Sequence, residues 1–184
     1  MRYLPNGKQM SEADAHTIHE IGIPSLVLME RAALQIVETM HKKNISTEKS
    51  LIVCGSGNNG GDGFAVARLL TEQGKHADVL FAGKEASLSE ECRCQKQIVE
   101  NMGISVFTEF PDEEYTVIID AVFGVGLCRE ITGHYKDVID WMNLQDAEKV
   151  AVDIPSGICA ATGKILGTAF RADLTAVSYT HLTL

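Results

Sequence analysis

The sequence predicts an α/β fold of three layers, in which helices cover both faces of a mostly parallel, doubly wound sheet. Short apolar runs, such as residues 51–54 and 116–120, alternate along the chain with longer segments of helical periodicity. Most of these runs are apolar at consecutive positions, as in strands that are buried on both faces. The 184 residues contain no repeat, linker or low-complexity segment, so we expect one domain with right-handed crossovers.

Two helices are expected before the first strand. Ser11 and Asp14 have the spacing of a helix-capping pair, so residues 1–10 should form an arm and a helix should follow. That helix should end near Gly22. A second helix should begin after Pro24, because apolar residues recur at helical spacing from there to about residue 43. We interpret its methionines as core residues.

The remaining elements follow from apolar runs, glycine stops and capping pairs. Residues 51–54 form the first strand, and a glycine-rich loop at 55–63 leads from it into a helix over 61–73. We expect further strands at 77–82, 104–107, 116–120, 149–154 and 174–177, further helices at 87–102 and 134–143, and a long loop or hairpin at 158–172. Ser87 and Glu90 form the capping pair of the helix at 87–102.

Composition excludes several classes of function. With 16 basic and 25 acidic residues the net charge is −9, which disfavours binding to nucleic acid or to an anionic membrane. No apolar run approaches the roughly 20 residues that span a bilayer, and the N-terminus lacks the apolar core of a signal peptide. The five cysteines are an odd number without metal-type pairs, so we expect reduced thiols and a cytoplasmic protein.

Three loops follow the ends of apolar strands and should converge. In open α/β sheets a ligand binds beyond the carboxyl ends of the strands, where the winding reverses. The loops at 55–63, 120–130 and 153–157 leave such ends, and they carry Asp62, Asp120 and Asp153. Asp62 either caps its helix or accepts hydrogen bonds from hydroxyls of a ligand. Asp120 and Asp153 either bond to loop backbone as structural groups or take part in a site.

A cluster of carboxylates needs a cation, hydrogen-bond donors or a proton. Asn59 and Ser156 add neutral oxygens in the same loops, which gives a set of hard ligands without histidine or cysteine. This set suits K⁺, and Mg²⁺ stays open as an alternative. The chain contains no nucleophile elbow, P-loop lysine or HExxH motif, so covalent catalysis and metal-dependent hydrolysis are poorly supported.

The loops resemble the signature loops of a known family. Cys-Gly-Ser-Gly-Asn-Asn-Gly-Gly-Asp-Gly at 54–63, Asp-Ala-Val-Phe-Gly-Val-Gly-Leu at 120–127 and Val-Asp-Ile-Pro-Ser-Gly at 152–157 are similar to those of the NAD(P)H-hydrate epimerases, the YjeF N-terminal domain. Ala13-Asp14 and the segments 22–25 and 28–30 resemble its N-terminal helices. The resemblance covers about residues 8–177.

The resemblance implies a Rossmann-like domain that forms a homodimer. It implies epimerisation of the R and S forms of hydrated NADH and NADPH, a metabolite-repair isomerase reaction, in partnership with an ADP- or ATP-dependent dehydratase. It implies one K⁺ per subunit, held by Asn59, Asp120 and Ser156. It places the substrate on Asn58, Asn59, Gly60, Gly61 and Asp62, on Gly124, Val125, Gly126, Leu127, Cys128, Arg129 and Glu130, and on Asp153. The preference between the two dinucleotides stays open.

Asp153 is our candidate for the catalytic acid and base. Lys84 is a further candidate for a role in catalysis. The alternative is that it is a solvated lysine in a loop. Residues 178–184 depart from the family pattern, so we expect a domain over 1–177 that is truncated before an atypical, artefactual tail, without a dehydratase domain. The alternative function is a non-catalytic scaffold that binds a nucleotide-like ligand. A dehydrogenase is disfavoured because no acidic residue ends the strand at 77–82.

Overall fold

The computed structural model describes residues 7–177, with side chains from residue 12 onward. In this part of the chain six parallel strands form one sheet in the order β3-β2-β1-β4-β5-β6. The strands are β1 (Lys49–Cys54), β2 (His76–Phe81), β3 (Val106–Phe107), β4 (Val117–Ala121), β5 (Glu148–Val152) and β6 (Leu174–Ala176). The chain winds outward from β1 to β3 and then crosses back to β4, so the doubly wound sheet is confirmed, with its winding reversal between β1 and β4.

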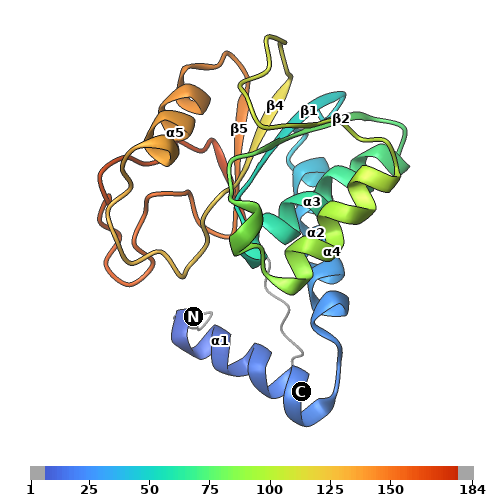
Figure 1. Ribbon diagram of the computed structural model, residues 1–184, viewed down its shortest axis with the longest axis vertical. Coiled ribbons are helices and arrows are strands. Elements are labelled where there is room, and N and C mark those ends of the chain that lie inside the picture. The colour runs from blue at the N-terminus through green and yellow to red at the C-terminus, as the bar shows by residue number, and fades with distance from the viewer. Residues whose placement is uncertain (1–6, 178–184) are drawn as a thin grey trace.

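Helices lie on both faces of the sheet (Figure 1). They are α1 (Gly7–His16), α2 (Ser25–Lys42), α3 (Asn58–Glu72), α4 (Glu90–Asn101) and α5 (His134–Leu144), with a π-turn η1 (Thr17–Ile21) and a 3₁₀ turn η2 (Glu85–Ser87). Helices α2, α3 and α4 cover one face and α5 covers the other, whereas α1 extends away from the sheet at one end of the molecule (Figure 1). The three-layer prediction with two additional N-terminal helices is therefore confirmed.

Each face of the sheet has its own apolar core, and β1 contributes to both. Ile52 and Cys54 pack with Phe64 of α3, whereas Leu51 and Val53 point to the opposite face, toward the side chains of α5. Successive strand residues point to opposite faces, so a strand buried on both must be apolar at every position. This explains why the sequence shows runs rather than alternation. No helix in the described range is long and apolar enough to cross a bilayer.

The starts of three helices, α1, α3 and α4, differ from the sequence prediction. Helix α1 already begins at Gly7, so Ser11 lies inside it and the expected arm at 1–10 is helical from residue 7. Helix α3 begins at Asn58 rather than at residue 61, which makes the second half of the glycine-rich loop the first turn of a helix. A pair of residues at capping distance does not exclude an earlier start, because glycine and asparagine can also enter a helical turn.

The cap of α4 is Ser89 and not Ser87. The Ser89 hydroxyl accepts a hydrogen bond from the Cys92 N–H at 3.2 Å, whereas the Ser87 hydroxyl donates to the Lys84 carbonyl at 3.0 Å within η2.

Two other expectations are confirmed. Gly22 ends the first helical segment with φ +82°, and an antiparallel bridge between Ile158 and Ile165 makes a hairpin in the 158–172 segment.

Core packing of α2 follows the predicted helical face with one exception. Met29 and Met40 are buried, in agreement with their interpretation as core residues, and Ala33 is fully buried. Leu26, in the first turn, is 37% exposed, because the start of α2 projects beyond the sheet. The proposed tail at 178–184 lies outside the described residues.

We predict that Gly60→Ala destabilises the fold far more than Gly57→Ala. A Cβ at Gly60 would lie 2.0 Å from the Gly55 carbonyl oxygen, whereas no atom of the described residues lies within 4 Å of a Cβ at Gly57. Because backbone cannot move aside cheaply, the first change should lower the free energy of unfolding by at least about 1–3 kcal/mol. The second should stay within about 0.5 kcal/mol. Urea denaturation measures both, and equal losses would contradict the close-packing explanation.

Candidate functional site

A cavity of about 770 Å³ opens where the winding of the sheet reverses. It is lined by Asp14, Ser56, Gly57, Asn58, Asn59, Asp62, Ser87, Val122, Phe123, Gly124, Val125, Gly126, Leu127, Cys128, Arg129 and Asp153. The loops after β1, β4 and β5 therefore meet at one site, as the strand-end rule predicts.

The close approach of the loops after β1 and β4 depends on Gly55. Its N–H donates to the Ala121 carbonyl at 3.0 Å, and a Cβ there would lie 2.1 Å from the Val122 carbonyl oxygen. Helix α3 starts directly afterwards, with Gly57 as an N-cap that offers no side-chain acceptor. Asn58 and Asn59 in this first turn line the cavity, and the free N–H groups of a first turn favour an anionic ligand such as a pyrophosphate.

Asp62 does not cap the helix. No side chain caps α3, and the Asp62 carboxylate makes no hydrogen bond with any residue between 7 and 177. Burial raises its pKa well above the ordinary value, and the negative charges of Asp153 and Asp14 raise it further. Of the two alternatives from the sequence, a carboxylate that is available to ligand hydroxyls agrees with this geometry.

Asp153 lies in the turn after β5 with a left-handed backbone, at φ +67°. Its own N–H donates to the Ala176 carbonyl at 2.9 Å, and its Oδ2 accepts a bond from the Val125 N–H at 3.3 Å. Burial raises the pKa of this carboxyl, the bond from Val125 opposes the rise, and the charge of Asp14 adds to it. A carboxyl of this kind holds its proton at a higher pH than an exposed aspartate and can both donate and accept one.

Asp120 is fully buried and bonded to the loop after β5. Its Oδ1 accepts bonds from the Ser156 hydroxyl at 2.7 Å and the Val122 N–H at 3.1 Å, and its Oδ2 accepts one from the Ser156 N–H at 2.7 Å. Burial raises the pKa of Asp120 to about 6, although the bonds from Ser156 and Val122 lower it. Three donors therefore do not fully compensate this charge, and a nearby cation would.

The side-chain amide of Asn59, like the Asp120 carboxylate, is not fully compensated by the described residues. Both its Nδ2 and its Oδ1 are buried without a hydrogen-bond partner among the described residues. A Cβ at Gly124 would lie 3.4 Å from Asn59 Cγ and 3.2 Å from Asp153 Oδ2, so these two side chains flank Gly124 closely. Leaving a buried amide unsatisfied costs about 1–3 kcal/mol. The amide oxygen of Asn59 and the carboxylate and hydroxyl oxygens of Asp120 and Ser156 fit a weakly demanding cation such as K⁺.

The other predicted site residues divide into two groups. Residues 124–129 line the cavity together with Asn58. Gly60 and Gly61 do not line it, since they pack against the Gly55 carbonyl and against Met29. Glu130 lines a smaller neighbouring cavity of about 160 Å³, and Lys84 is exposed and absent from the cavity wall.

Sequence reasoning missed several residues of the wall. Asp14 reaches the cavity from α1, and Ser56, Ser87 and Phe123 also line it. Ser56 lies within the predicted loop at 55–63 and Ser87 opens the predicted helix at 87–102, so both could have been included. Asp14 belongs to a helix that precedes every strand, so the rule that ligands bind beyond the ends of strands does not predict its place in the site. Only the resemblance of Ala13-Asp14 to a family motif pointed there.

Comparison with known proteins gives consistent matches over most of the chain. The family model described as YjeF-related protein N-terminus matches residues 25–183. A protein of Oenococcus oeni named NAD(P)H-hydrate epimerase is 42% identical over 182 residues, which cover 97% of this chain and 87% of that protein. One of Limosilactobacillus reuteri with the same name is 44% identical over 174 residues, covering 94% of this chain and 82% of that protein.

A solved structure shares the fold. The crystal structure of the yeast protein YNL200c superposes with a TM-score of 0.82 at 20% sequence identity, covering 95% of this chain and 79% of that chain. At this identity the likeness concerns the fold alone.

We predict that K⁺ raises the melting temperature of this protein and that Asn59→Ala removes the increase. An ion that binds the folded state alone stabilises it, and the buried amide of Asn59 has no other described partner to lose. Scanning calorimetry in potassium chloride and in tetramethylammonium chloride of equal ionic strength measures the increment.

Asn143→Ala is the matched control. The Asn143 amide donates to the Ala169 carbonyl at 2.9 Å and accepts from the Arg171 N–H at 2.8 Å, remote from the cavity wall. This variant should lose about 1–3 kcal/mol in either salt and keep the K⁺ increment. A K⁺ increment that survives Asn59→Ala would contradict the assignment of Asn59.

Proposed function

This chain belongs to the YjeF-related protein N-terminus family, and we propose that it is an isomerase that interconverts the R and S forms of hydrated NADH and NADPH. This is a metabolite-repair reaction, because hydration damages the reduced cofactor. The observation that carries the proposal is the position of Asp153: its carboxyl, with a raised pKa, opens into the same cavity as the first turn of α3 and the loop at 122–129.

The chemistry needs a group that gives a proton and a group that takes one, and a single carboxyl can do both. The substrate carries a hydroxyl on C6 of the reduced nicotinamide ring. Asp153 in its acid form protonates this hydroxyl, and the C6–O bond breaks as the ring nitrogen donates its electron pair. Water then adds to C6 from the opposite face, and the Asp153 carboxylate takes the proton that it releases. The acid form is regenerated, so atoms and charge balance over the cycle.

The surroundings of Asp153 favour both forms of this carboxyl. Partial burial and the charge of Asp14 favour the protonated form, whereas the N–H of Val125 stabilises the carboxylate. Asp62 has the more strongly raised pKa and no hydrogen-bond partner among residues 7–177, so it is suited to bind a hydroxyl of the substrate. The N-terminal turn of α3 is suited to the pyrophosphate.

We propose that Asn59, Asp120 and Ser156 hold one K⁺ per subunit. The unsatisfied amide of Asn59 and the incompletely compensated charge of Asp120 support this assignment. Such an ion would offset the carboxylates and fix the loops after β1, β4 and β5 relative to one another.

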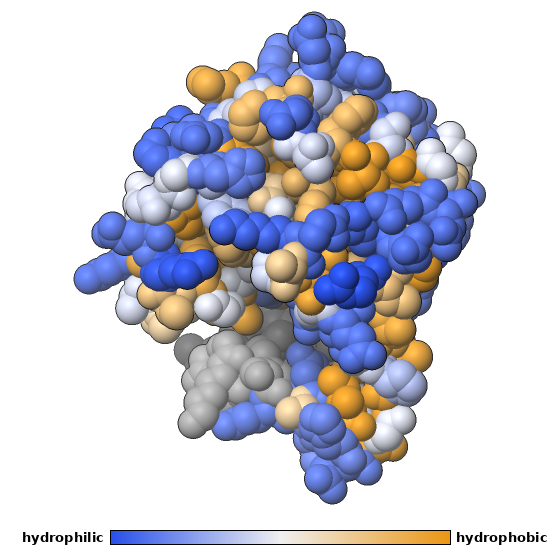
Figure 2. All heavy atoms as spheres, in the orientation of Figure 1, coloured by the Kyte–Doolittle hydropathy of each residue, from blue (hydrophilic) through white to orange (hydrophobic). Residues whose placement is uncertain are grey.

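We further propose a homodimer in the cytoplasm. Apolar side chains gather over the segment from η1 to the start of α2 (Figure 2), where Ile21 and Val27 are each 46% exposed. An apolar surface of this kind favours association with a second copy. The five cysteines are free thiols, as expected in a reducing compartment. The S epimer should be consumed by an ADP- or ATP-dependent dehydratase that acts on that form only.

We predict that Asp153→Asn lowers the epimerisation rate by at least about a hundredfold while the fold is retained. Asparagine tolerates the left-handed backbone at this position and keeps an oxygen that can accept the bond from Val125, but it cannot carry the proton. The assay mixes both epimers with an S-specific dehydratase, so that disappearance of the R form reports epimerisation.

Asp112→Asn, in an exposed loop, is the control and should keep full activity. Full activity of Asp153→Asn, with an unchanged melting temperature, would refute the catalytic role of Asp153. If the wild-type chain binds the mixture but leaves the R form intact, it is a binding scaffold and the epimerase proposal fails.

A further inference from the structure

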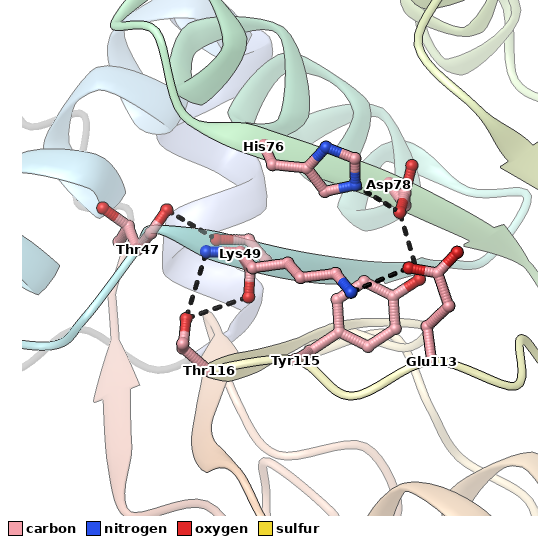
Figure 3. Close-up of polar contacts among 8 residues, drawn as sticks. Thr47, Lys49, His76, Asp78, Glu113, Tyr115 and Thr116 are labelled. Carbon is pink, nitrogen blue, oxygen red and sulfur yellow. Dashed lines mark hydrogen bonds and ion pairs between the residues drawn. The ribbon is translucent and has the colours of Figure 1, made fainter.

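A second cluster of ionisable side chains lies at the amino ends of the strands, at the edge of the sheet opposite the cavity. His76 and Asp78 are alternate residues at the start of β2, so they project from the same face, and Glu113 lies in the segment before β4. One ligand atom from each of the three lies within 4.8 Å of those of the other two. Figure 3 shows the imidazole and the two carboxylates turned toward one another.

The buried member of the cluster is held in place by a tyrosine. Asp78 is 3% exposed, and its Oδ2 accepts a hydrogen bond from the Tyr115 hydroxyl at 3.1 Å and lies 2.9 Å from His76 Nε2 (Figure 3). No hydrogen bond within residues 7–177 uses the other oxygen, Oδ1. A carboxylate that is oriented by an outer hydrogen bond and keeps a free oxygen is the arrangement found around metal ligands.

The segment that carries Glu113 is also fixed to β1. The Thr116 N–H donates to the Lys49 carbonyl at 2.8 Å, and the Thr116 hydroxyl accepts from the Lys49 N–H at 3.2 Å. Glu113 itself is half exposed, as is His76, so both side chains can rotate. Two ligands about 2.1 Å from one tetrahedral Zn²⁺ ion lie about 3.4 Å apart, so side-chain movements of up to about 1.4 Å close the cluster.

A positive charge already occupies this place. Lys49 Nζ lies 2.7 Å from Glu113 Oε2 and 5.2 Å from the centre of the Tyr115 ring (Figure 3). The Lys49 side chain is 36% exposed, so its ammonium group can turn into solvent when another cation takes over. A divalent ion would bring two charges to a pair of carboxylates that now share one ammonium.

We propose that His76, Asp78 and Glu113 bind a divalent transition-metal ion, with Zn²⁺ as the best match. One imidazole nitrogen and two carboxylate oxygens are ligands that Zn²⁺ accepts in a tetrahedral site, with water in the fourth position. The ion would connect the start of β2 to the segment before β4, across β1, and so stabilise the amino edge of the sheet. This site is independent of the epimerase proposal, because it shares no residue with the cavity.

Calorimetric titration of untagged wild-type protein with zinc chloride tests the site. We expect a single ion per chain, and Glu113→Gln and His76→Ala should each weaken binding at least about tenfold. Tyr115→Phe should weaken it about tenfold, because it removes only the hydrogen bond that orients Asp78. Lys49→Met should lower the dissociation constant, since it removes the competing ammonium group.

His41→Ala, at an exposed histidine near the end of α2, is the matched control and should bind zinc like the wild type. Circular dichroism checks that each variant folds. Absence of zinc binding to the wild type would overturn the proposal. Binding that is insensitive to His76→Ala but is lost in Asp62→Asn would also overturn it, because the ion would then lie in the carboxylate cavity.

Discussion

The arrangement of the site depends on one backbone contact, between Gly55 after β1 and Val122 after β4. Any side chain at Gly55 would collide with the Val122 carbonyl, so only glycine lets the two strand ends lie this close. The contact puts the first turn of α3 beside the loop at 122–129 and closes the crevice at the winding reversal. The Asp120–Ser156 bonds then join the end of β4 to the loop after β5.

Negative charge is the second constraint. Asp14, Asp62 and Asp153 line one cavity, and Asp120 is buried beneath it. Among Asp62, Asp120 and Asp153, burial is the main cause of each raised pKa, so each favours its proton or a compensating ligand. A cation would offset part of this charge, and hydroxyl groups of a substrate could donate hydrogen bonds to the carboxylates.

The sheet and the convergence of three loops could be predicted from the sequence because apolar runs and strand-end carboxylates are local signals. The start of α4 could not, since Ser87 has the capping pair with Glu90 but its hydroxyl bonds to the Lys84 carbonyl, and Ser89 caps the helix instead. Asp14 was missed because its place depends on how α1 packs, for which no local pattern exists. The cluster around Asp78 was missed because His76 and Glu113 are far apart in the chain and meet only through strand pairing.

The left-handed backbone of Asp153 has a consequence for how such proteins diverge. At φ +67° few residue types fit without strain, and asparagine and glycine are the main alternatives to aspartate. The substitutions that the fold tolerates most easily are thus ones that remove the proton-carrying group. Exchange of one carboxylate oxygen for an amide nitrogen would leave a well-folded descendant that recognises the same dinucleotide without turning it over. Overall shape would not distinguish the two, whereas the identity of this single side chain would.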